Sequence, residues 1–173
     1  MKQIITIICL LLSVTSNAQK KESNLMDLLQ HADSVELLSH QDLVLRATIE
    51  EMKQGMGTTD RSIATPSGGV NDCIVTQRKR INQNSLDELI YILGKQYDSD
   101  IAAERASCFV PHQSIVMYHD GKCAIADICF DCRQTYAHGG LVLPDDFLST
   151  DEQWEDLKQF FIRNGISRKI QRH

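Results

Sequence analysis

The sequence predicts a two-layer α+β domain, an antiparallel sheet of about four strands with two amphipathic helices packed on one face. Two segments, one opening at Ser85 and one at Thr150, carry apolar residues at helical spacing, so each helix has one face to bury. The Asp120-Gly121 pair separates two apolar runs, which is the strongest short-range signal of a β-hairpin. Because hairpins outnumber crossovers in this order of elements, we expect an antiparallel sheet with both helices on one side.

The composition fits one domain of mildly acidic character. The chain has 173 residues, with 18 Lys and Arg against 23 Asp and Glu. This length supports one well-packed domain rather than two. The acidic balance argues against a broad nucleic-acid-binding surface, so no nucleic-acid partner is expected.

Residues 1–18 have the pattern of a signal peptide and are left out of the predicted fold. Lys2 supplies the positive start, residues 4–12 are apolar except for Thr6, and Ser16-Asn17-Ala18 places small residues at a cleavage site. The apolar run is shorter than the roughly 20 residues that span a bilayer. We therefore expect a periplasmic or secreted protein, with residues 19–173 as a single domain and no integral membrane segment after cleavage.

The mature N-terminal part is expected to hold a short helical turn, a strand and then a loop. Apolar residues recur at helical spacing over 25–32, and Val35 and Leu37 alternate with polar neighbours over 33–39. A single helix over 24–39 is the competing interpretation. Residues 53–72 contain four glycines and Pro66 without any period, which predicts a long flexible loop.

A strand over residues 73–81 and a helix from Ser85 are expected next. Cys73, Val75 and Ile81 fall on one face of that strand. Ser85 with Glu88 three residues later matches a capping box at the start of a helix. The apolar stripe of this helix consists of Leu86, Leu89, Ile90 and Leu93.

The predicted hairpin joins strands over 114–118 and 123–130, and a loop and a last helix follow it. A type I′ turn needs positive φ at both central residues, which suits Asp120 and Gly121. Residues 133–148 are punctuated by glycine and proline and predict a loop. Thr150 is expected to cap the last helix, and Gly165 to end it. The buried stripe of that helix is Trp154, Leu157, Phe160 and Phe161.

Five cysteines follow the signal peptide, and outside the cytoplasm cysteines tend to pair. They are Cys73, Cys108, Cys123, Cys129 and Cys132. Their odd number leaves at least one of them without a partner inside the chain.

The hairpin register makes one pairing testable. With Asp120 and Gly121 as the two loop residues, Cys129 lies opposite His112, and Cys132 lies one position from Cys108. A Cys108–Cys132 disulfide is therefore the best placed, with Cys129 as the alternative partner because Pro111 can disturb the pairing.

A second bridge has less support from the sequence. Cys73 and Cys123 both lie on predicted strands and could be joined if those strands are neighbours. The sequence does not fix that adjacency.

Three chemical interpretations compete with a structural role for these cysteines. Cys129-Phe130-Asp131-Cys132 is a C-x-x-C sequence, but no helix follows it and Asp131 disfavours a thiolate. Cys108, His112, Cys129 and Cys132 could hold tetrahedral zinc, although their spacing matches no standard structural site. Cys129 beside His112 could act as a nucleophile, but no third orienting residue is identifiable.

Other catalytic signatures are absent from the sequence, and no cofactor is expected. It contains no G-x-S-x-G, no phosphate-binding glycine loop and no H-E-x-x-H. The remaining histidines that were considered are expected to be exposed to solvent: His31, His40, His119 and His173.

The cysteine block resembles a pattern in small exported bacterial proteins for which no activity is established. That pattern reads C-[YF]-x-P-R-x-x-I-x-F, then G-K, then I-C-x-x-C. It is matched by residues 108–112, by Gly121-Lys122 and by residues 128–132, with His112 in place of the arginine. The resemblance therefore implies no established activity.

We therefore expect an exported, disulfide-stabilised domain that is not an enzyme and binds a protein or another envelope component. The alternative is a thiol-disulfide redox or metal-binding protein that uses Cys129 and Cys132.

Overall fold

A computed structural model describes residues 23–45, 49–97, 106, 109–144 and 146–167. The predicted signal peptide, Cys108 and His173 lie outside the described residues. Within them, no helix is both long and apolar enough to cross a membrane.

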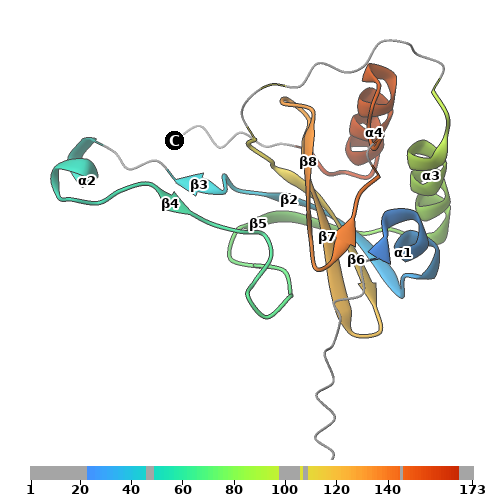
Figure 1. Cartoon of the computed structure of the whole chain (residues 1–173), viewed down its shortest axis with the longest axis horizontal. Helices are drawn as coiled ribbons and strands as arrows, with labels where there is room; N and C mark the ends of the chain where they lie inside the picture. The colour runs from blue at the N-terminus through green and yellow to red at the C-terminus, as the bar shows by residue number, and fades with distance from the viewer. Residues whose placement is uncertain (1–22, 46–48, 98–105, 107–108, 145, 168–173) are drawn as a thin grey trace, which may run out of the picture.

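A five-stranded antiparallel sheet forms the centre of the fold (Figure 1). Its spatial order is β5 (Val75–Arg80), β2 (Ser34–His40), β6 (Gln113–His119), β7 (Lys122–Cys129) and β8 (Gln134–His138). The predicted α+β class and the strand near residues 33–39 are thus confirmed. The strand number is corrected from about four to five, because residues 134–138, expected in a loop, pair with β7 as β8.

The predicted hairpin and its register are confirmed. His119 pairs with Lys122 at the turn, and Gln113 pairs with Ile128 at the far end. Asp120 has φ +48° and Gly121 has φ +68°, as a type I′ turn requires. This register determines toward which face of the sheet each side chain of β6 and β7 points.

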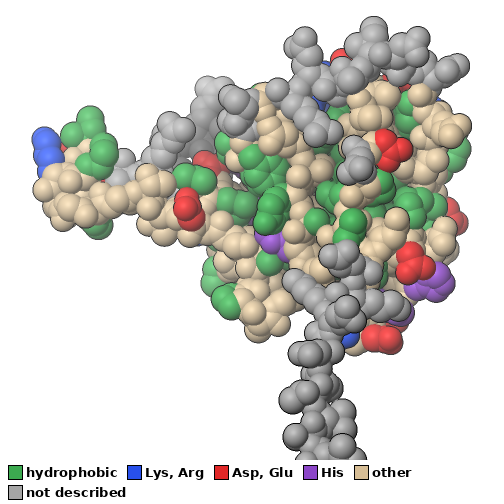
Figure 2. All heavy atoms as spheres, in the orientation of Figure 1, with side chains coloured by type: hydrophobic (Ala, Val, Ile, Leu, Met, Phe, Trp, Pro, Cys, Tyr) green, Lys and Arg blue, Asp and Glu red, His purple; other side chains and the backbone are tan. Residues whose placement is uncertain are grey.

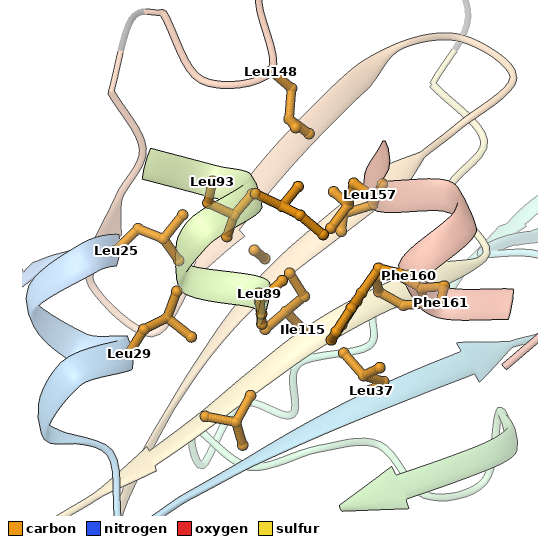
Figure 3. Packing of buried hydrophobic residues seen from close by; sticks show 14 of the residues in the cluster. Leu25, Leu29, Leu37, Leu89, Leu93, Ile115, Leu148, Leu157, Phe160 and Phe161 are labelled. Atoms are coloured by element: carbon orange, nitrogen blue, oxygen red, sulfur yellow. The ribbon is translucent and has the colours of Figure 1, made fainter. Parts of the chain in front are cut away.

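Three helices cover one face of the sheet and enclose the larger core (Figures 1 and 3). They are α1 (Leu25–His31), α3 (Gln83–Gly94) and α4 (Asp151–Arg163). Leu29 of α1, Leu89 of α3 and Phe160 of α4 are fully buried against Leu37 and Ile115 of the sheet. The prediction of two helices on this face is therefore corrected to three.

The helix starts follow their capping residues. The side chain of Thr150 accepts a hydrogen bond from the Gln153 amide, as predicted for α4. The start of α3 is corrected, because the Asn82 side chain accepts from the Ser85 amide and so begins the helix before Ser85. Gly165 has φ +80° just after α4, which fits its predicted place at the helix end.

The opposite face of the sheet, here called the open face, has no helix over it among the described residues. Ile63 and Ile74, in the segment between β4 and β5, pack on Leu38, Val116 and Ile125 in a second, smaller core. The expectation of a flexible loop over residues 53–72 is therefore corrected, because Ile63 in this segment is fully buried against the sheet.

Short elements extend the domain at two places. β3 (Val44–Leu45) pairs with β4 (Thr59–Asp60) in an arm that carries α2 (Ile49–Lys53) and projects from the sheet (Figure 1). Apolar side chains are exposed near the arm tip, as Figure 2 shows. β1 (Ser23–Asn24) pairs in parallel with β9 (Leu141–Val142).

Candidate functional site

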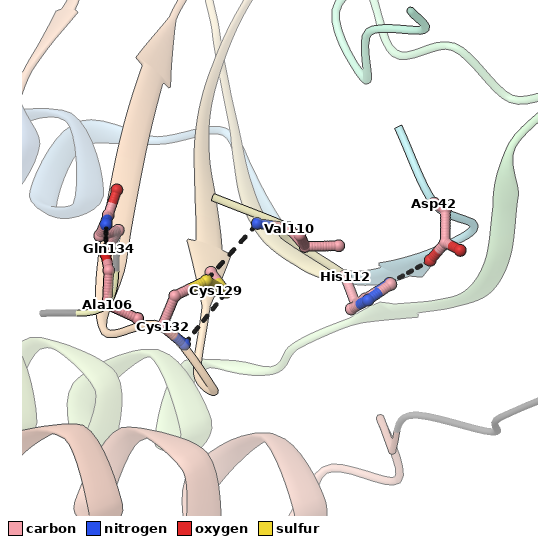
Figure 4. Close-up of a disulfide and its surroundings, with 7 residues drawn as sticks. All are labelled: Asp42, Ala106, Val110, His112, Cys129, Cys132 and Gln134. Carbon is pink, nitrogen blue, oxygen red and sulfur yellow. Dashed lines mark hydrogen bonds and ion pairs between the residues drawn. A yellow bond between two sulfur atoms is a disulfide. The ribbon is translucent and has the colours of Figure 1, made fainter. Parts of the chain in front are cut away.

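Cys129 and Cys132 form a disulfide within the turn that joins β7 to β8 (Figure 4). Their Cα atoms are 5.4 Å apart, and each residue is only 2 % exposed. Arg133 completes the turn with φ +52°, after which the chain returns as β8.

The predicted Cys108–Cys132 bridge is corrected, because Cys132 is bonded to Cys129. The prediction extended the β6–β7 register past Cys129. Instead the chain reverses there into β8, so Cys132 does not continue along β7. The preceding segment still lies beside the turn, since the Ala106 amide donates to the Cys132 carbonyl.

Two backbone amides point at the sulfur atoms of this turn. The amide of Cys132 donates to Cys129 Sγ at 3.2 Å, and the amide of Val110 donates to Cys132 Sγ at 3.5 Å. Such N–H groups would stabilise negative charge on either sulfur if the disulfide were reduced. The exchange of a thiol with this disulfide is opposed by the burial of both cysteines.

A cavity of about 260 Å³ lies beside the disulfide, between the turn and the end of α4. Its apolar wall includes Phe130, Phe161 and Ile166. Phe130 packs edge-on against Phe161 at 5.5 Å between ring centroids. Lys158 stands at the same cavity as an exposed cation.

The Cys73–Cys123 bridge that the sequence left open does not form, and both of these residues are free thiols. β2 and β6 separate β5 from β7 in the sheet, so the strands that were candidates for bridging are not neighbours. Cys73 is exposed. Cys123 is half-buried, and its burial, aided by Glu36 and opposed by Arg78, raises the pKa of its thiol to about 11.

His112 does not form the nucleophilic pair with Cys129 that was one of the competing interpretations. The sulfur of Cys129 is held in the disulfide, and His112 Nδ1 lies 3.4 Å from Asp42 Oδ1. Figure 4 shows the His112 ring turned toward Asp42 and away from the disulfide. The set Cys108, His112, Cys129 and Cys132 likewise offers no pair of thiolates to a metal in this state.

Sequence reasoning missed a buried polar cluster on the open face, which we call the Asp127 cluster. It consists of His40 on β2, Ser114 on β6, Asp127 on β7 and His138 on β8. Ser114 Oγ donates to Asp127 Oδ1 at 2.6 Å, and His138 Nε2 lies 3.1 Å from Asp127 Oδ2. The prediction that His40 is exposed is wrong, because only 3 % of the residue is accessible.

The cluster keeps Asp127 ionised in spite of its burial. Burial acts to raise the pKa of Asp127, but hydrogen bonds from His138, His40 and Ser114 outweigh it, so the pKa lies below its ordinary value. A sequence signal for the cluster existed, since Asp127 interrupts the apolar run from Ala124 to Ile128 on a strand. An acid in such a position needs partners on the neighbouring strands.

Comparison with known proteins adds no relative, since no protein-family model, curated protein or solved structure matches the chain.

Proposed function

We propose that the chain is an exported binding domain, not an enzyme, which takes the apolar end of a ligand into the cavity beside the Cys129–Cys132 disulfide. The observation that carries the proposal is the cavity itself, with its aromatic and aliphatic wall next to a cross-linked turn. A disulfide within four residues restricts the turn, so this side of the cavity is formed before a ligand arrives. Preorganisation of this kind lowers the entropic cost of binding.

The size and charge of the cavity indicate the class of ligand. About 260 Å³ is slightly below the usual range of small-molecule pockets, which suits a short aliphatic chain better than a whole drug-sized molecule. Lys158 is the one Lys or Arg that lines this cavity, and Asp131 also lines it. Among the described residues no ion pair of Lys158 is seen, so its charge can serve a ligand. The proposed ligand is therefore a short acyl chain or apolar segment that ends in a negative group, carried by a protein or another envelope component.

Octanoate is a suitable probe, because the only tryptophan of the chain reports on this region. Trp154 packs edge-on against Phe130 with 6.1 Å between ring centroids, and Phe130 lines the cavity. We expect octanoate to change the Trp154 fluorescence saturably and octylamine to bind several-fold more weakly. Equal responses to both probes would contradict the assigned charge, and no response to either would contradict the cavity as a binding site.

Two lysine variants make the charge test specific. Lys158→Gln is expected to weaken octanoate binding by about two- to fivefold, the range expected when a partly solvated ion pair is lost. Lys53→Gln on the projecting arm is the matched control and should leave the affinity unchanged.

Thiol-disulfide exchange is the second candidate, favoured by the two amides that point at Cys129 and Cys132. The non-enzymatic proposal expects the purified protein to be inactive in the reduction of insulin by dithiothreitol. Activity that disappears in Cys129→Ser would replace the binding proposal with the redox one.

Export is part of the proposal and rests on the charged, apolar and small-residue order of residues 1–18 and on the resemblance of the cysteine block to exported bacterial proteins. Expression of the full chain in a Gram-negative host should yield periplasmic protein that begins near residue 19. Retention in the cytoplasm with residues 1–18 attached would contradict it.

A further inference from the structure

The projecting arm presents apolar side chains that its own domain leaves exposed. The arm runs from β3 through α2 to β4, and near its tip Ile49, Met52 and Met56 are 63 %, 56 % and 47 % exposed. None of the residues of α2 is buried. Apolar side chains gathered on a surface with charged residues around them are typical of a contact with a partner. The arm tip, visible in Figure 2, is therefore a candidate interaction surface.

The arm is too small to hold its shape by its own contacts. β3 and β4 contribute two residue pairs, and α2 has five residues. A two-stranded hairpin is marginally stable at best in water, and a helix of this length is not stable by itself. Apolar contacts outside the arm are therefore expected to supply the missing stability.

The cavity beside the disulfide offers a surface complementary to the arm tip. Val110 and Ile162 line it and are 40 % and 47 % exposed, so apolar groups reach from the cavity to the surface. Lys158 at the cavity and Glu50 on the arm carry opposite charges, and no ion pair of either is seen among the described residues. Asp131, which also lines the cavity, already interacts with another group of the chain. Complementary charges of this kind select and orient a partner.

The root of the arm lies next to the same cavity. Asp42, which precedes β3, is 3.4 Å from Nδ1 of His112, and His112 lines the cavity. At the root the Arg61 amide donates to the Leu43 carbonyl at 2.6 Å, and from there the arm projects away from the sheet (Figure 1). Because arm and cavity begin side by side, a two-fold axis beside them lets each of two copies place its arm in the cavity of the other.

We propose that the chain forms a dimer in which the arm tip of each copy enters the cavity beside the disulfide of the other. Ile49 and Met52 supply the apolar contact, and Glu50 pairs with Lys158 of the partner subunit. The inference rests on the proposed function, because it names the apolar segment with a negative group that the cavity takes. Since the two contacts are reciprocal, the assembly closes at two copies, and the first contact brings the second arm to its site.

Sedimentation velocity of the disulfide-intact protein tests the dimer. We expect a dimer and no larger species at about 100 μM, where a Kd near 1 μM leaves little monomer. Met52→Asp should weaken dimerisation at least tenfold, because the contact would bury a charge without a partner. Tyr91→Asp, at an exposed apolar residue of α3, is the matched control and should leave the dimer unchanged. A monomeric wild type, or a dimer that Met52→Asp leaves intact, would overturn the proposal.

Exchange of the two charges tests the docking site. Glu50→Lys and Lys158→Glu should each weaken the dimer by about two- to fivefold, as expected for a partly solvated ion pair. The double variant should recover the wild-type dimer. Both residues are exposed, so the variants should fold, which circular dichroism verifies. Failure of the double variant to recover would overturn the assigned contact.

Octanoate distinguishes a failure of the dimer from a failure of the proposed acyl ligand. It should dissociate the wild-type dimer, because it competes with the arm, and it should bind the monomeric Met52→Asp variant. A monomeric wild type that binds octanoate would overturn the dimer and leave the acyl ligand standing. Absence of octanoate binding by Met52→Asp, with recovery of the dimer on charge exchange, would contradict the acyl ligand and support the arm as the occupant.

Discussion

The two faces of the sheet are both buried, but they are buried in different ways. The helix-covered face is lined mainly by apolar side chains, among them Leu37 and Phe160. The open face has a small apolar centre under Ile63 and Ile74, and next to it lies the ionised Asp127 with its histidines. Burial of a charge costs free energy even when it is paired. The comparison therefore assigns stability mainly to the helix face and places the buried titratable groups on the open face.

The largest expected effect tests the helix face. Phe160→Ala removes a fully buried ring from the centre of the core and should lower the free energy of unfolding by about 3–5 kcal/mol. Urea denaturation followed by Trp154 fluorescence measures it. Tyr91→Ala, at a residue that is 65 % exposed on α3, is the control and should cost under about 0.5 kcal/mol. A loss below about 1 kcal/mol for Phe160→Ala would show that this face does not dominate stability.

The disulfide turn, at the end of the sheet, should contribute less. Removal of a cross-link between residues three positions apart costs about 2 kcal/mol in the chain-entropy model, because the closed loop is short. Cys129→Ser/Cys132→Ser should therefore fold and show this loss in urea, together with weaker octanoate binding. Cys73→Ser, at an exposed free thiol, is the control. Unchanged octanoate affinity in the doubly substituted protein would show that the disulfide does not contribute to binding at the cavity.

Sequence reasoning recovered local structure well and long-range structure poorly. The Asp120-Gly121 turn fixed a register that the structure confirms residue by residue, because turn geometry and side-chain alternation are local. β8 was missed because Gln134-Thr135-Tyr136-Ala137-His138 lies at a sheet edge and has weak apolar alternation. The disulfide was misassigned for the same reason, since the chain reversal at Cys129 depends on β8.

The candidate sites show the same division between local and tertiary signals. The C-x-x-C sequence is visible in the chain, whereas the cavity beside it requires the end of α4 to approach the turn. His40 and Asp127 are far apart in the sequence and meet only because β6 lies between β2 and β7. No spacing rule could have joined them.

A smaller effect is expected from the polar cluster of the open face. Ser114→Ala removes the hydroxyl that donates to Asp127 and should cost about 1–2 kcal/mol, because a buried carboxylate then loses a partner. Urea denaturation followed by Trp154 fluorescence measures it. Ser67→Ala, in an exposed turn of the segment that covers this face, is the matched control. A gain in stability on Ser114→Ala would mean that the hydroxyl is not needed to hold Asp127.

The smallest effect is expected at the two described free thiols, which need no substitution. Cys123 lies on the open face, whereas Cys73 is exposed to solvent. The pKa of Cys123 is raised from 9.0 to about 11, so its thiolate fraction at pH 8 falls about a hundredfold. Iodoacetamide at pH 8 should label Cys73 at least tenfold faster than Cys123, with peptide mapping to assign the label. Because more thiolate forms as pH approaches the raised pKa, the Cys123 rate should rise steeply between pH 8 and pH 10. In urea, where the protein is unfolded, both thiols should react at equal rates. Equal rates in the native protein as well would show that the open face does not shield Cys123.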